Sequence, residues 1–80
     1  MINDLELANY LITDIRQFSK KEISVGLEEV ETEDGDLEYM FNYDDFYLQN
    51  NISMLVKYIK GIRDALFVVN KYKGYWNARF

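Results

Sequence analysis

Carboxylates are the most abundant side chains in this sequence that could do chemistry, and most of them lie in its middle third. Residues 22–45 contain ten acidic residues and no basic one, which gives this segment a formal charge of −10. The ten are Glu22, Glu28, Glu29, Glu31, Glu33, Asp34, Asp36, Glu38, Asp44 and Asp45. Paired carboxylates can perform acid–base catalysis when a cleft shifts the pKa of one of them. A domain of 80 residues has little room for such a cleft, so we expect that the protein is not an enzyme.

Several other residue types that catalysis needs are missing. The sequence has no histidine and no cysteine, so neither a Ser–His nor a Cys–His nucleophile can form. The absence of cysteine also excludes disulfide bonds and thiolate–zinc sites. The four glycines stand far apart, whereas a phosphate-binding loop needs them clustered. We therefore expect no catalytic residue and no cofactor.

The Glu-Asp-Gly-Asp segment at residues 33–36 is superficially similar to a calcium-binding loop. If Gly35 occupied the sixth position of an EF-hand loop, Val30 and Phe41 would stand at the first and twelfth positions. Neither side chain can coordinate a cation. The segment is therefore interpreted as a solvated turn, and we expect no metal site.

The acidic segment has two interpretations. Its charges can form a solvated face that protects an edge strand from aggregation. Alternatively they form a binding surface: Glu29, Glu31 and Glu33 recur at every second residue, ~6.6–7 Å apart along one face of a strand. This spacing is similar to that of phosphates along a nucleic-acid strand, and nearby tyrosines would add contact area at low entropic cost. The partner-binding residues that we expect are Glu28, Glu29, Glu31, Glu33, Asp34, Asp36, Glu38, Tyr39, Tyr43, Asp44, Asp45 and Tyr47.

The C-terminal part of the chain has the opposite charge. Residues 46–80 carry six basic residues and one acidic residue, a formal charge of +5. On a helix, several of these bases point away from the apolar stripe, with Phe67 at their border. Either the first helix packs against this side, or the side is a homodimer or secondary surface. The residues of that surface would be Val56, Lys60, Arg63, Phe67 and Lys71.

The last ten residues interleave four aromatic with three basic side chains. Such a segment can stack on nucleic-acid bases and neutralise phosphates. Alternatively, Trp76 and Phe80 fold back over the sheet and complete a thin core.

Apolar periodicity predicts two helices. The first spans residues 4–18 with Asn3 as its N-cap. The second begins at Asn51 or Ser53 and ends just before Gly74, a typical residue beyond a helix C-terminus. The predicted inward stripes are Leu5, Ala8, Leu11, Ile12, Ile15 and Phe18 in the first helix, and Ile52, Leu55, Ile59, Ile62, Leu66 and Val69 in the second.

Between the helices, residues 22–28 and 37–43 alternate polar and apolar side chains, which predicts a β-hairpin. A three-residue loop at 33–35, with Gly35 in the left-handed conformation, would pair Leu27 with Phe41 and bring the apolar residues of both strands to one face. A bulge at residues 28–29 would have the same effect. The sequence therefore predicts a small single α+β domain, residues 1–80, built as helix–β-hairpin–long helix (αββα), with both helices packed on one face of the antiparallel sheet.

The longest apolar run has five residues, 65–69, so we expect no membrane segment and a location in the cytoplasm of a bacterium or phage-infected cell. The overall profile resembles the small acidic inhibitors of phages and mobile elements, including some anti-CRISPR and anti-restriction proteins. That resemblance implies a partner that is a basic, nucleic-acid-handling host protein, with no direct binding of nucleic acid. The alternatives are an antitoxin or immunity protein, a structural subunit, and a nucleic-acid-binding protein that uses Lys57, Lys60, Arg63, Lys71, Lys73 and Trp76.

Overall fold

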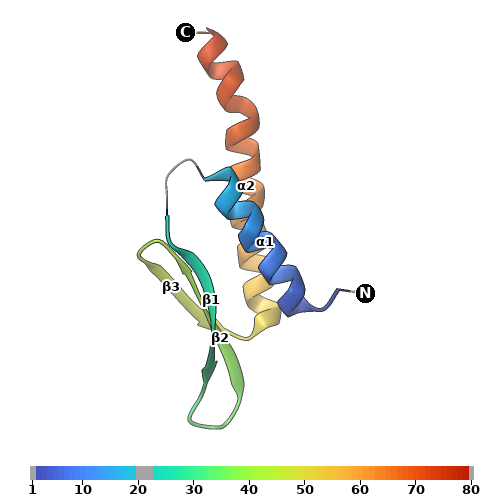
Figure 1. The fold of residues 1–80 in the computed structure, drawn as a ribbon, viewed down its shortest axis with the longest axis vertical. Helices are drawn as coiled ribbons and strands as arrows, with labels where there is room; N and C mark the ends of the chain where they lie inside the picture. The colour runs from blue at the N-terminus through green and yellow to red at the C-terminus, as the bar shows by residue number, and fades with distance from the viewer. Residues whose placement is uncertain (1, 20–22, 80) are drawn as a thin grey trace.

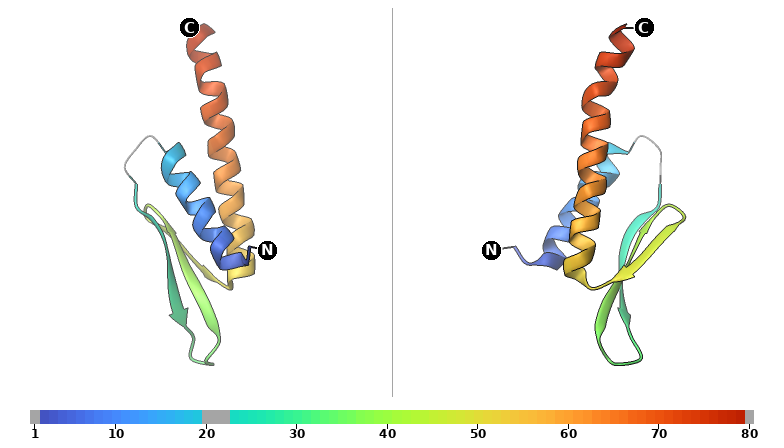
Figure 2. Two further views of the ribbon diagram at one scale, coloured as in Figure 1. Left: turned by 45° about the vertical axis from the view of Figure 1, so that its right-hand side comes forward. Right: turned by 180° about the vertical axis from the view of Figure 1, so that it is seen from behind.

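The computed structural model describes residues 2–19 and 23–79, with the backbone alone for residues 72–79. The elements in chain order are α1 (Asp4–Phe18), β1 (Val25–Glu31), β2 (Leu37–Tyr43), β3 (Phe46–Asn50) and α2 (Ile52–Arg79). The strands form one antiparallel sheet in the order β1-β2-β3, and both helices cover the same face of it (Figures 1 and 2). The predicted α+β class and the single helical layer are confirmed.

α1 has the predicted bounds because its two ends are capped by side chains. The Glu6 amide donates to Oδ1 of Asn3 over 2.8 Å, which satisfies one of the free amides of the first turn. At the other end, both the amide and the hydroxyl of Ser19 donate to the carbonyl of Ile15. The helix is tied to the sheet by Arg16, whose Nη2 donates to the carbonyl of Val25 over 2.6 Å.

The β1–β2 hairpin has the predicted register. Val25 lies opposite Tyr43 and Leu27 opposite Phe41, which places their side chains on the face that the helices cover. Beyond the last strand pair, the Thr32 amide donates to the carbonyl of Asp36 over 3.0 Å, leaving three residues in the loop. Gly35 has a φ of 81°, as the three-residue loop requires. The loop needs no bulge at residues 28–29, because all residues of β1 are paired in sequence.

The sheet has a third strand that was not predicted from the sequence. β3 pairs antiparallel with β2, and Tyr43 lies opposite Phe46 across a two-residue turn made of Asp44 and Asp45. Asp44 has a φ of 56°, a left-handed conformation that aspartate tolerates better than most residues. Its amide donates to the carbonyl of Ser24 over 2.7 Å, which fixes the turn against the start of β1. An Asp-Asp turn lacks the glycine that marks most tight hairpins, so the turn was missed.

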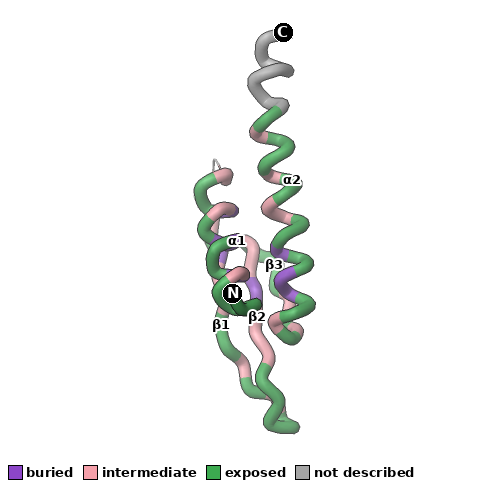
Figure 3. The backbone as a smooth tube through the Cα atoms, turned by 90° about the vertical axis from the view of Figure 1, so that its right-hand side faces the viewer, coloured by how far each residue is buried: buried purple, intermediate pink, exposed green. Residues whose placement is uncertain are grey.

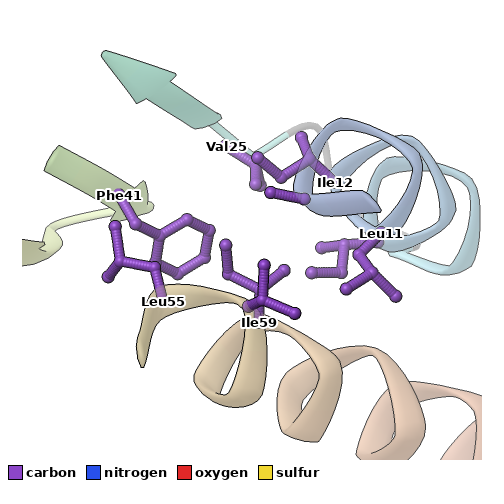
Figure 4. Packing of buried hydrophobic residues seen from close by; sticks show 9 residues of the cluster. Leu11, Ile12, Val25, Phe41, Leu55 and Ile59 are labelled. Carbon is purple, nitrogen blue, oxygen red and sulfur yellow. The ribbon is translucent and has the colours of Figure 1, made fainter. Parts of the chain in front are cut away.

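The core lies between the sheet and the two helices. Figure 4 shows Phe41 and Leu55 on one side of it, and Ile12 and Val25 on the other, with Ile59 between them. The residues buried there are Ala8, Leu11, Ile12, Ile15, Val25, Phe41, Leu55, Val56 and Ile59. α1 packs on β1, and α2 packs on β2 and β3. The predicted inward stripes are confirmed at their centres, whereas Leu5 and Val69 at their ends are exposed.

α2 is longer than predicted. It runs through Gly74 to Arg79, and its 28 residues correspond to ~42 Å of helix. A glycine inside a helix costs only about 1 kcal/mol relative to alanine, and no proline follows to stop it. Asn51 is the N-cap, because its Oδ1 accepts from the Met54 amide over 2.9 Å. Val69 is 61% exposed because α1 ends at Phe18, which already lies beside Phe67 and Asn70.

The second half of α2 therefore projects beyond the rest of the molecule (Figures 1 and 3). The principal extents are 55 × 31 × 15 Å and the radius of gyration is 14.8 Å. A compact domain of this length would have a radius of gyration of about 12 Å. The β1–β2 hairpin extends at the opposite end of the long axis, so the acidic and the basic segments of the chain are held apart (Figure 1).

Candidate acidic binding surface

The end of the β1–β2 hairpin, residues 28–38, carries seven of the predicted site residues and is called here the acidic tip. These are Glu28, Glu29, Glu31, Glu33, Asp34, Asp36 and Glu38. All are exposed except Glu38, which is half-buried. The tip extends beyond the helical layer, so its carboxylates can be approached from several sides (Figures 1 and 2).

The strand pleat divides these carboxylates between two faces. Glu29 and Glu31 lie on the same face of the sheet as Leu27, but both are exposed, and the end of the hairpin extends beyond the helices (Figure 1). Glu28 and Glu38 lie on the opposite face. The prediction that Glu33 lies in one row with Glu29 and Glu31 is wrong, because Glu33 belongs to the turn. The acids surround the tip instead of lining a single face.

Four predicted site residues lie away from the tip. Tyr43, Asp44, Asp45 and Tyr47 are at the other end of β2, whose seven residues span ~20 Å. They therefore do not form one patch with residues 28–38. Tyr39 and Tyr43 are half-buried beside the core, and Tyr47 is 65% exposed on the face opposite the helices. Glu22 lies outside the described residues.

Leu37 is a surface residue of the tip that was not among the predicted site residues. Its side chain is 52% exposed and lies directly across from Glu31, while Tyr39 lies across from Glu29. The helix-side face of the tip thus combines two carboxylates with a leucine and a tyrosine. The signal was present in the sequence, because Leu37 belongs to the same alternation as Tyr39 and Tyr43, which were predicted to contact a partner.

The acids of the tip have no cationic partner among the residues that the structure describes. The ion pairs within residues 2–19 and 23–71 are those of Arg63, with Asp14 at 3.2 Å and with Asp64 at 2.9 Å. Glu38 accepts a hydrogen bond from Nε2 of Gln49 over 2.9 Å. The Gln49 side chain is neutral, so this hydrogen bond is not an ion pair. Mutual repulsion of carboxylates destabilises a compact state. In the described part of the chain, the basic α2 does not relieve it by direct contact.

The basic side of α2 contacts α1 along one border, at Arg63 and Phe67. The Phe18 and Phe67 rings pack with their centroids 5.9 Å apart, and Nδ2 of Asn70 donates to the carbonyl of Phe18 over 2.8 Å. Arg63 is held by its two carboxylates beside an open groove of about 300 Å³. The groove is lined by Asp14, Phe18, Arg63, Asp64 and Phe67.

This arrangement corrects the predicted secondary surface. Val56 is only 8% exposed and belongs to the core, so it cannot line an interface. Phe67 is 52% exposed but its ring is partly covered by Phe18. Lys60 and Lys71 are exposed. The interpretation that the first helix packs against this side of the second is confirmed at Arg63 and Phe67.

The aromatic and basic side chains of the last residues cannot be placed in either predicted role. The backbone is helical through Arg79. The side chains of Tyr72, Lys73, Tyr75 and Trp76 lie outside the described part of the chain, as does Phe80. Nucleic-acid stacking and packing over the sheet both remain predictions for this segment.

Two further properties concern the described residues. Their acidic side chains form no cluster of three or more that could hold a metal ion. Within the described residues, neither α1 nor α2 is both long enough and apolar enough to cross a lipid bilayer.

Comparisons of the chain with protein-family models, with curated proteins and with solved structures found no match. The chain's own charges and geometry are therefore the basis for assigning it a class.

Proposed function

We propose that the protein is a non-enzymatic inhibitor that uses its acidic tip to occupy a basic, nucleic-acid-binding surface of another protein. The observation that carries this proposal is the set of seven carboxylates on a projecting hairpin, none of which is paired with a cation of the described chain. The carboxylates would take the place of the phosphates that such a surface normally binds.

The energetics of the tip support binding to a basic partner. Carboxylates that repel one another gain more from an incoming arginine or lysine than carboxylates that are already paired. Complementary charge also accelerates association and disfavours acidic partners. Leu37 and Tyr39, which lie among the carboxylates, supply apolar contact area for a stable complex.

The proposed target is a nuclease or other defence protein of a bacterial host, and the proposed source is a phage or mobile element. The support is the combination of small size, an acidic tyrosine-rich surface and the absence of histidine and cysteine. In this role the protein acts in the cytoplasm, binds no nucleic acid itself and needs no cofactor.

The experiment measures DNA binding and cleavage by a panel of purified CRISPR effector complexes and restriction endonucleases in the presence of the protein. We expect inhibition of at least one, overcome by excess substrate DNA and weakened as salt rises from about 0.05 to 0.3 M, because surface charges are screened over about 10 Å. The triple variant Glu29→Lys, Glu31→Lys, Glu33→Lys should lose inhibition chiefly through a slower association rate.

The matched control reverses charge on the other surface. Lys57→Glu with Lys60→Glu changes two exposed α2 residues and should leave inhibition nearly unchanged. Inhibition that survives in the acidic triple variant, but is lost in the lysine double variant, would refute the proposal. Binding to a ribonuclease toxin instead of a defence nuclease would assign the same acidic surface to an antitoxin.

A further inference from the structure

β3 is an edge strand with no charged residue. Its sequence is Phe-Tyr-Leu-Gln-Asn, and only β2 pairs with it. Outside that ladder, the backbone groups of residues 46–49 make no hydrogen bond with other described residues. Such an edge is a template for pairing with another chain, and proteins usually protect it with charges, proline or a bulge. The opposite edge of this sheet has that protection, because β1 carries Glu28, Glu29 and Glu31.

An uncharged face of α2 lies on the same side of the molecule. It consists of Met54, Tyr58, Gly61, Ala65 and Val69, all of which are exposed. At 3.6 residues per turn these positions fall within an arc of ~80°, on the side of the helix turned away from its contacts with α1. The face adjoins β3, because the Tyr58 ring stacks on Phe46 with centroids 5.7 Å apart and an interplanar angle of 16°.

We propose that a second copy of this chain binds the free edge of β3 and the uncharged face of α2 at the same time. β3 pairs antiparallel with the β3 of the second copy about a two-fold axis at Leu48, which places Tyr47 of each copy opposite Gln49 of the other. The product is a six-stranded sheet with four helices on one face, in which α2 of one copy lies against α2 of the other along Met54 and Tyr58.

The spacing of strands and helices agrees with this arrangement. With neighbouring strands ~4.8 Å apart, β3 would lie ~2.4 Å and β2 ~7.2 Å from the two-fold axis. α2 packs on both of these strands, so its axis would lie ~5 Å from the two-fold axis. The two α2 helices would then be ~10 Å apart, the distance at which helices pack. Gly61 has nothing within 4 Å of an added Cβ, so the helix backbone itself is accessible there.

Charge complementarity selects the antiparallel arrangement. The acidic tip and the projecting half of α2 lie at opposite ends of the long axis (Figure 1). A two-fold axis across the middle brings each acidic tip to the end of the assembly at which the other copy's basic α2 projects. A parallel arrangement would instead bring the two acidic tips together. This inference stands independently of the proposed inhibition, because it concerns the β3 edge and not the tip.

Two variants that differ at one position test the pairing. Both carry Gln49→Lys, which keeps a partner for Glu38 within the chain. Tyr47→Lys combined with Gln49→Lys places like charges opposite each other across the axis, whereas Tyr47→Glu combined with Gln49→Lys places opposite charges there. Sedimentation equilibrium should show a dimer for the wild type, at least a tenfold weaker association for the first variant, and restored association for the second. Glu28→Lys, on the far edge, is the control and should remain dimeric.

Equal behaviour of the two variants, or a wild type that stays monomeric at millimolar concentration, would overturn the proposal. Circular dichroism establishes that each variant is folded. Amide hydrogen exchange of the wild type gives a second readout that needs no variant. Protection of amides in residues 46–50 should increase with protein concentration, and protection independent of concentration would also contradict the β3–β3 pairing.

Discussion

At the scale of single residues, Gly35 determines how the acidic tip is presented. Its φ of 81° closes the three-residue loop, and the loop in turn fixes the register that places Val25 and Leu27 over the core. The same turn holds Glu33, Asp34 and Asp36 at the end of the hairpin. A single backbone conformation thus connects the folding of the sheet with the placement of its charges.

Gly35→Val should lower the free energy of unfolding by about 1–2 kcal/mol. The cost comes from the left-handed backbone and not from crowding, because nothing lies within 4 Å of an added Cβ. Thermal or urea unfolding monitored by circular dichroism measures it. Glu33→Val, in the same turn but at a residue without positive φ, is the control. A Gly35→Val variant as stable as wild type would mean that the loop has another conformation.

At the scale of elements, α1 and α2 run in the same direction and meet through the contacts of Phe18 and Arg63 (Figure 2). These contacts occupy part of the surface of α2 that the sequence had suggested for a dimer, at Arg63 and Phe67. They explain why an exposed phenylalanine on this helix is not by itself evidence of a partner.

A double-mutant cycle with Phe18→Ala and Phe67→Ala should give a coupling energy of about 0.5–1.5 kcal/mol, as is typical of aromatic pairs. Urea unfolding of the four proteins measures it. Neither substitution should change the association state seen by sedimentation. A coupling near zero, or a loss of dimer in Phe67→Ala, would place Phe67 at an interface instead of against α1.

Most of the fold could be predicted because local signals agreed with one another. The apolar period of α1, its Asn3 cap and the Asp-Gly turn each specified an element. β3 was missed because its turn uses Asp44 in place of glycine, and because five uncharged residues give too short an alternation. The end of α2 was missed because Gly74 is a typical but not a necessary stop.

The site was predictable in composition but not in shape. The sequence identified which carboxylates belong to the hairpin, since their positions between the two strands follow from the register. The predicted strand 37–43 already places Asp44 and Asp45 a strand's length from the tip, but these two residues were assigned to the same surface on their charge alone. The exposure of Leu37 depends on how far the hairpin extends past the helices.

At the scale of the whole molecule, charge is separated along the 55 Å axis. The acidic tip is at one end and the basic, partly apolar half of α2 is at the other (Figure 1). A chain with only a modest net charge of −5 therefore has two surfaces of opposite sign. We propose that the first surface binds the target, and we predict that the second does not bind nucleic acid.

The most direct test of that assignment is the electrophoretic mobility of labelled single- and double-stranded DNA and RNA mixed with the purified protein at low salt. We expect no retardation, since the chain as a whole carries a net charge of −5 and low salt extends the range over which that net charge repels phosphates. Retardation that is abolished by Trp76→Ala and by Lys71→Glu would contradict the assignment. Such a result would place the function at the basic aromatic end of α2 and leave the acidic tip as a solvated edge.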